Sequence, residues 1–149
     1  MSIITPQQVI LDLPEGDRAE ATRALAQTLV DTGRVTDLEA LLADVARREA
    51  MMSTGLFDGI AIPHCRSTAV TEPSLAFGRS TSGVPWGAED GPATLIFLIA
   101  VPAESGQDHL SILAMLARKL MREDFKNALR QASDAAAVVT VIEDEVIKA

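Results

Sequence analysis

Apolar residues are spaced along the chain in two ways, one typical of strands and the other of helices. Strand-length apolar runs occupy residues 8–12, 60–62, 75–79 and 93–101. The run at 93–101 is almost continuously apolar, which predicts a central strand that is buried on both faces. Pro102 should end this strand, because proline has no N–H to donate to a sheet.

The other apolar residues recur every three or four positions, which predicts helices with one buried face. The first helix should begin after Asp17 and end at Gly33, since aspartate caps helix starts and glycine commonly follows helix ends. The second should begin after Thr36 or Asp37 and carry Arg48 near its C-terminal end. A cation there suits the helix dipole, so Arg48 also has an ordinary structural explanation.

Three further helices are expected, at about 109–120, at 123–131 and from residue 134 onward. The apolar stripe of the first of them is expected at Leu110, Leu113, Ala114, Ala117 and Leu120. Strands that alternate with helices predict an α/β fold with helices on both faces of a sheet. At 149 residues, the chain should form a single domain over residues 2–148. This pattern leaves open whether the sheet is parallel or mixed.

His64 follows directly after one of the predicted strands. The strand at 60–62 should stop at Pro63, so that a loop from His64 to about residue 72 begins at a strand edge. An imidazole in that place can face a substrate or a partner protein. The ordinary alternative is a loop histidine on the rim of the core.

Composition and charge exclude several classes of function. The formal net charge of −8 argues against nucleic acid as a partner, because binding a phosphate backbone needs clustered lysine and arginine. Aromatic residues make up 3% of the chain, so the core must consist of aliphatic side chains. The single cysteine cannot form an internal disulfide, and no apolar run approaches the ~20 residues that span a bilayer. These features predict a cytoplasmic protein.

His64, His109 and Arg48 together could support phosphoryl transfer. A neutral imidazole is a nucleophile near physiological pH, and phosphoryl transfer mainly needs positioning and positive charge. His64 would be the nucleophile, His109 in the first turn of a helix could donate to a phosphoryl oxygen, and Arg48 would neutralise charge. The chain has no GxxxxGK[ST] motif, which argues against a nucleotide-driven kinase.

Four segments together resemble one known family. Gly59-Ile-Ala-Ile-Pro-His64 resembles the phosphorylation-site segment of the fructose/mannitol-type (type 2) EIIA domain of the phosphoenolpyruvate-dependent sugar phosphotransferase system (PTS). The segment at 48–55, with its arginine and its Ser-Thr-Gly ending, is similar to a second motif of that family. His109-Leu110 and the segment at 71–78 match two more, and the last of these is most like fructose-type members.

The resemblance implies a three-layer α/β/α sandwich with a mixed sheet. It also implies phosphorylation of His64, supported by His109 and Arg48, with Ser53 and Thr54 as possible phosphoryl-binding residues. The implied donor is the phosphocarrier protein HPr, and the implied acceptor is a cysteine of EIIB. The membrane is involved only indirectly, through EIIC, and neither a metal nor an organic cofactor is expected.

Cys65 departs from many family members, which have a smaller residue after the active histidine. It suggests a thiol enzyme with Cys65 as the nucleophile and His109 with Asp108 as base and orienter, or a zinc site of His64, Cys65 and His109. Neighbouring side chains in an extended segment point in opposite directions, which argues against a pocket shared by His64 and Cys65. Structural zinc takes four ligands, and only three candidates exist.

The sequence is consistent with three functions: sugar transport, with fructose as the sugar; nitrogen-type regulation through binding that depends on phosphorylation; and a regulatory domain that has lost transfer. Both histidines and Arg48 argue against the third. Four further side chains have two interpretations: Leu56, Phe57 and Ile112 either rim a partner surface or belong to the core, and Trp86 either covers the core edge or faces a partner.

Overall fold

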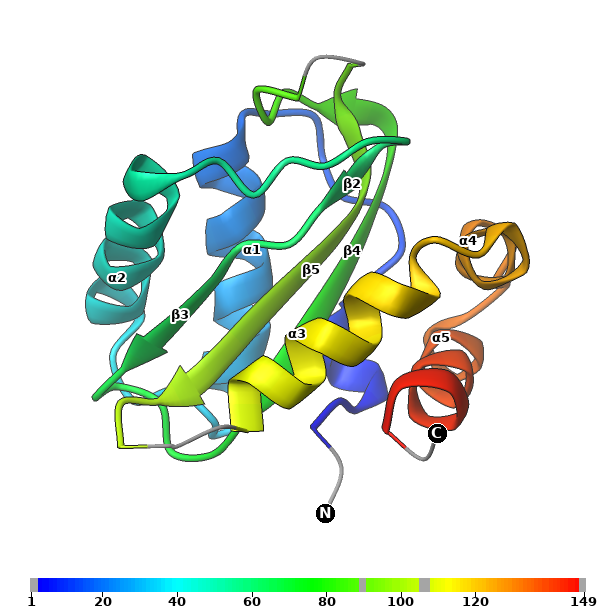
Figure 1. Ribbon diagram of the computed structural model, residues 1–149. Coiled ribbons are helices and arrows are strands. Elements are labelled where there is room, and N and C mark those ends of the chain that lie inside the picture. The colour runs from blue at the N-terminus through cyan, green and yellow to red at the C-terminus, as the bar shows by residue number, and fades with distance from the viewer. Residues whose placement is uncertain (1–2, 89–90, 105–107, 148–149) are drawn as a thin grey trace.

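The computed structural model describes residues 3–88, 91–104 and 108–147, without the side chains of residues 108–110. These residues form a five-stranded mixed sheet (Figure 1). The strands are β1 (Val9–Ile10), β2 (Ile60–Ala61), β3 (His64–Ser67), β4 (Ser74–Val84) and β5 (Ala93–Pro102). β5 is antiparallel to β4 and parallel to β2 and β3, and β1 is parallel to β4. The mixed sheet that the family resemblance implies is therefore confirmed.

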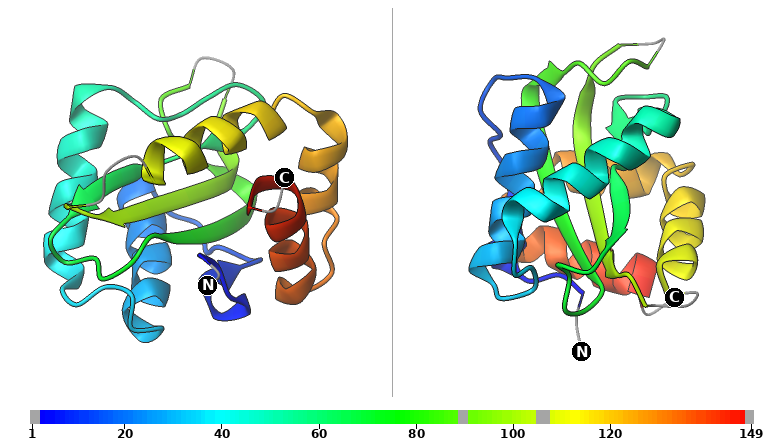
Figure 2. Two further views of the ribbon diagram at one scale, coloured as in Figure 1. Left: turned by 60° about the horizontal axis from the view of Figure 1, so that its bottom comes forward. Right: turned by 90° about the vertical axis from the view of Figure 1, so that its left-hand side faces the viewer.

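Helices cover both faces of the sheet. They are α1 (Arg18–Asp31), α2 (Leu38–Met51), α3 (Asp108–Lys119), α4 (Glu123–Arg130) and α5 (Ala135–Ile142), with a 3-10 turn at Pro6–Gln8 and a π-helical turn at Glu143–Ile147. Figure 2 shows α1 and α2 on one face and α3, α4 and α5 on the other. This is the expected three-layer α/β/α sandwich. No helix in the described ranges is long and apolar enough to cross a membrane.

β5 contributes to the core on each face. Ile96 and Leu98 pack under α1 and α2, whereas Leu95, Phe97 and Ile99 pack under α3, α4 and α5. Side chains of a strand alternate between faces, so an almost continuously apolar strand fills two cores at once. The prediction of a central strand at 93–101 is thus confirmed.

The predicted helix starts are confirmed at their caps. The Asp17 carboxylate accepts a hydrogen bond from the Glu20 N–H, and the Glu20 side chain accepts one from the Asp17 N–H. Asp37, rather than Thr36, caps α2 by accepting from the Ala40 N–H. These bonds satisfy backbone donors that have no partner within the helix.

Two sequence expectations were wrong. Residues 64–67 form β3 instead of the start of a loop, because Pro63 lacks a donor but still has an acceptor. Its carbonyl receives the Ile99 N–H at 3.0 Å, which keeps the chain beside β5. The predicted strand at 75–79 also continues to Val84, into the segment expected to be only turns.

The buried face of α3 matches its prediction only in part. Leu120 is buried and Leu113 half-buried as predicted, but Ala114 and Ala117 are exposed, and Leu116 is buried in their place. Larger side chains remove more apolar surface from water than alanine does, so they decide which face of the helix packs. Leu110 lies outside the described side chains.

Candidate functional site

His64 is the first residue of β3, a strand at the edge of the sheet that packs against α2 (Figure 1). Its imidazole is half-buried, and its Nδ1 lies 2.9 Å from the Ile62 carbonyl oxygen. A carbonyl oxygen only accepts hydrogen bonds, so this contact assigns the proton of the neutral ring to Nδ1. Nε2 then keeps its lone pair and is the ring atom able to act as a nucleophile.

A hollow of about 490 Å³ adjoins His64. It is lined by Asp44, Arg47, Arg48, Met51, His64, Cys65, Arg66 and Leu113. Arg47 donates to Asp44 at 2.6 Å, whereas half-buried Arg48 has no hydrogen-bond or ion-pair partner among the described residues. The structure therefore brings a nucleophilic imidazole and an available guanidinium to one concave surface.

Ser53 and Thr54 lie just after α2 and are not among the described residues that line this hollow. The Ser53 hydroxyl donates to the Trp86 carbonyl oxygen at 2.9 Å. The Thr54 hydroxyl donates to Glu49 at 2.6 Å and accepts from the Trp86 indole at 3.2 Å. Both hydroxyls are thus engaged within the protein.

His109 belongs to the first turn of α3 by its backbone, but its side chain lies outside the described residues. The same holds for Asp108.

Cys65 lines the same hollow as His64, contrary to the expectation that the two share no pocket, but its environment does not suit a thiol enzyme. Its side chain is buried in the core under α1 and α2. Burial, and secondarily the negative charge of Asp44, raises the pKa of the Cys65 thiol to about 12. The thiol is therefore protonated at neutral pH and is a poor nucleophile. No group of three or more potential metal ligands occurs in the described part of the chain.

The structure decides between the two interpretations of Leu56, Phe57, Trp86 and Ile112. Trp86 is buried in the core under α1 and α2, so it does not face a partner. Leu56 and Ile112 are half-buried against the other core. Phe57 is 50% exposed, and its ring lies 5.5 Å from the Lys126 ammonium group.

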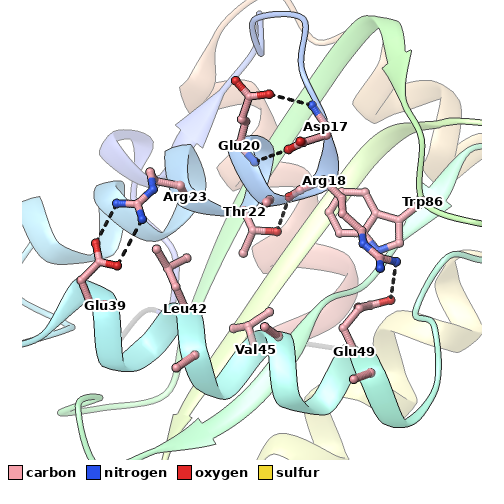
Figure 3. A pocket seen from close by; sticks show the side chains of 14 residues that line it. Asp17, Arg18, Glu20, Thr22, Arg23, Glu39, Leu42, Val45, Glu49 and Trp86 are labelled. Carbon is pink, nitrogen blue, oxygen red and sulfur yellow. Dashed lines mark hydrogen bonds and ion pairs between the residues drawn. The ribbon is translucent and has the colours of Figure 1, made fainter.

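Sequence reasoning missed Asp44, Met51 and Leu113 as lining residues of the hollow. The sequence did contain a signal for the two lining residues on α2. Helical spacing places Asp44 and Met51 on the same side of this helix as the predicted Arg48, next to its buried face. A second hollow, of about 540 Å³, separates α1 from α2 (Figure 3). None of the predicted site residues is among the described residues that line it.

Comparison with known proteins adds three findings. Residues 2–145 match the family model described as "Phosphoenolpyruvate-dependent sugar phosphotransferase system, EIIA 2". The chain is 41% identical over 148 residues to the fructose-specific EIIA component of the PTS of Haloferax volcanii, covering 98% of this chain and 96% of that relative. It is 33% identical over 141 residues to the fructose-specific EIIABC component of Bacillus subtilis, covering 94% of this chain but only 22% of that relative.

A crystal structure of the nitrogen regulatory protein IIA-Ntr from Neisseria meningitidis has the same fold. Its TM-score is 0.86 at 29% sequence identity, and the match covers 94% of this chain and 96% of that chain. The similarity thus extends to a protein named for transport and to one named for regulation.

Proposed function

Since the chain belongs to the EIIA 2 family of the phosphoenolpyruvate-dependent sugar phosphotransferase system, whose members are phosphotransferase relay proteins, we propose that His64 is its phosphorylated residue. Phospho-HPr would donate the phosphoryl group, and a cysteine of EIIB would accept it. The carrying observation is the contact of His64 Nδ1 with the Ile62 carbonyl oxygen at 2.9 Å, which leaves Nε2 as the nucleophile beside an open hollow.

In the first half of the relay, the Nε2 lone pair attacks phosphorus on the donor. The Nε2–P bond forms as the bond between phosphorus and the nitrogen of HPr breaks, and that nitrogen keeps the bonding electrons. In the second half, a cysteine thiolate of EIIB attacks the same phosphorus, and His64 Nε2 regains its lone pair. The Nδ1–H remains bonded to Ile62 in both halves, so the ring stays oriented.

Arg48 would stabilise the negative charge that spreads over the phosphoryl oxygens during transfer. Its guanidinium lines the hollow and has no protein partner in the described ranges, which supports this role. We assign His109 a hydrogen bond to a phosphoryl oxygen. Ser53 and Thr54 would contribute through the position of their loop, since their hydroxyls already bond to Trp86 and Glu49.

Fructose uptake is the proposed purpose of the relay. The relative from Haloferax volcanii is named as a fructose-specific EIIA component, and the two chains match over nearly their whole lengths. The EIIABC relative joins EIIA to further components in one chain, which supports EIIB as acceptor and EIIC as the indirect link to the membrane. We expect the domain to act in the cytoplasm, where Cys65 stays reduced.

The second candidate function is regulation through binding that depends on phosphorylation. The structural similarity to a nitrogen regulatory protein supports it. Transport requires that phosphorylated protein pass its phosphoryl group to EIIB, whereas regulation requires only that phosphorylation change a binding affinity. Incubation of the phosphorylated protein with the EIIB domain of the same organism, followed by intact mass measurement of both proteins, distinguishes the two.

The experiment that tests the relay uses phosphoenolpyruvate, enzyme I and HPr. We expect wild-type protein to gain one acid-labile phosphate by intact mass and His64→Ala to gain none, because the attacking Nε2 is missing. Cys65→Ala is the matched control, since it changes the neighbouring residue, whose buried thiol takes no part in the relay, and should be phosphorylated normally. A His64→Ala variant that still gains phosphate would contradict the assignment.

A further inference from the structure

Glu49 carries its negative charge at a position that disfavours it. It lies in the last turn of α2, where the helix dipole disfavours negative charge, and its side chain is only 9% exposed. Glutamate is rarely buried unless its charge is compensated by partners. The partners of Glu49 therefore indicate why this position is a glutamate.

Three groups converge on the Glu49 carboxylate. The backbone N–H of Thr54 donates to Oε2 at 2.7 Å, and the Thr54 hydroxyl donates to Oε1 at 2.6 Å. The Arg18 guanidinium lies 3.9 Å from Oε2. Figure 3 shows Arg18, Glu49 and Trp86 together at one end of the hollow between α1 and α2. The carboxylate thus fastens the end of α2 to the loop that follows it.

Backbone hydrogen bonds connect Thr54, and through it Glu49, to His64. The Thr54 carbonyl oxygen accepts the Ile62 N–H at 3.1 Å, and the Ile62 carbonyl oxygen receives the His64 Nδ1–H at 2.9 Å. A continuous series of hydrogen bonds therefore links Glu49, Thr54, Ile62 and His64. On its other side, Glu49 follows Arg48 directly in the same helical turn.

We infer that Glu49 is a positioning residue that holds Arg48 and His64 at a fixed separation. This inference rests on the proposed relay. Arg48 lines the hollow beside His64 and Glu49 lines the hollow beside α1, so Glu49 acts on the transfer through Arg48 and His64 and touches no phosphoryl group itself. Helix ends fray readily because their last carbonyl groups lack partners within the helix, and the bonds from Thr54 to Glu49 tie the last turn of α2 to the loop that follows it.

Glu49→Gln tests the inference. The amide oxygen of glutamine can accept one of the two Thr54 donors, and its NH₂ group cannot accept the other. We expect the maximal rate of phosphoryl transfer from HPr to fall roughly tenfold, with little change in KM, because small displacements of catalytic groups affect the transition state most. Glu39→Gln is the matched control, since Glu39 is an exposed residue of the same helix that pairs with Arg23.

Thr54→Val is the second variant, in case Glu49→Gln folds poorly. It removes the hydroxyl and leaves the backbone bond, so we expect a smaller decrease in the same direction. Thr54→Ser keeps the hydroxyl and should restore the rate. Far-UV circular dichroism monitors folding of each variant, because Trp86 emission changes in Thr54→Val through the lost hydrogen bond from its indole to Thr54 alone.

The deciding measurement repeats Glu49→Gln in an Arg48→Ala background. If Glu49 holds Arg48 and His64 at a fixed separation, Glu49→Gln slows transfer less in the Arg48→Ala background than in wild-type protein, because only its effect on His64 remains. Equal decreases in both backgrounds, or an unchanged rate in folded Glu49→Gln, would overturn the positioning role while leaving the relay intact. A folded wild-type protein that HPr does not phosphorylate would overturn the relay and this inference together.

Discussion

His64 and Cys65 are neighbours in the chain but have opposite environments. Both belong to β3, where successive side chains point to opposite faces of the sheet. Both residues line the hollow beside α2 and α3, but the His64 side chain is half-buried while that of Cys65 is buried in the core under α1 and α2. Burial therefore distinguishes a residue available for chemistry from one that packs.

The thiol of Cys65 should be inert in the folded protein. Its pKa is raised from an ordinary 9.0 to about 12, so we expect no alkylation by iodoacetamide at pH 8 until urea unfolds the chain. The pKa of the thiol is higher in the folded than in the unfolded chain. The contribution of the protonated thiol to stability is therefore fully present below pH 9 and is lost between pH 9 and 12. Cys65→Ala should cost about 1 kcal/mol of unfolding free energy without slowing transfer. Rapid alkylation of native protein would contradict this.

At the scale of elements, apolar spacing predicted the helices and the strands that are fully buried. It missed β3, because His64, Arg66 and Ser67 do not form an apolar run and Pro63 suggested an end. The mixed topology also could not be derived from spacing, since strand direction depends on which distant segments pair. For the same reason, sequence alone indicated Arg48 and His64 as candidates, while only the fold brings them to one hollow.

The loop between α2 and β2 is held at its far end by α4. Asp58 has a left-handed backbone (φ 60°), and its carboxylate accepts from the Lys126 ammonium group at 2.6 Å. Arg130 also donates to the Asp58 carbonyl oxygen at 3.0 Å. Lys126 is almost fully buried, so Asp58 compensates a charge that would otherwise lack solvent. The loop that carries Ser53 and Thr54 is thus fixed at both ends.

Asp58→Asn should destabilise the protein without straining the backbone, because asparagine also tolerates positive φ. We expect a loss of about 1 kcal/mol in urea unfolding at pH 7, a modest value because the carboxylate is 40% exposed and partly screened. The hydrogen bond from Lys126 lowers the pKa of Asp58, so the contribution is present above pH 3.8 and is lost as the pH falls below it.

Asp124→Asn is the matched control for Asp58→Asn, since exposed Asp124 forms its ion pair with exposed Arg122 and should leave stability essentially unchanged. A difference between Asp58→Asn and wild type that persists at low pH would show that the lost charge is not the cause.

At the scale of the whole molecule, β5 joins two cores that helices cover from opposite sides. Leu98 lies in the core under α1 and α2, and its neighbours Phe97 and Ile99 lie in the core under the other helices. Separate unfolding of one core would expose one face of β5 to water while the other stayed packed. The shared strand therefore favours cooperative unfolding of both layers.

Leu129→Ala tests this coupling. Leu129 is fully buried in the core under α3, α4 and α5, whereas Trp86 is buried in the core on the other face. The substitution should cost about 2–5 kcal/mol, because a buried leucine leaves a cavity. If the layers unfold together, Trp86 emission and far-UV circular dichroism shift to the same lower urea midpoint. A Trp86 transition that stays at the wild-type midpoint would mean that the two cores unfold independently, and the helices that carry Arg48 and Leu113 would then be free to move separately around His64.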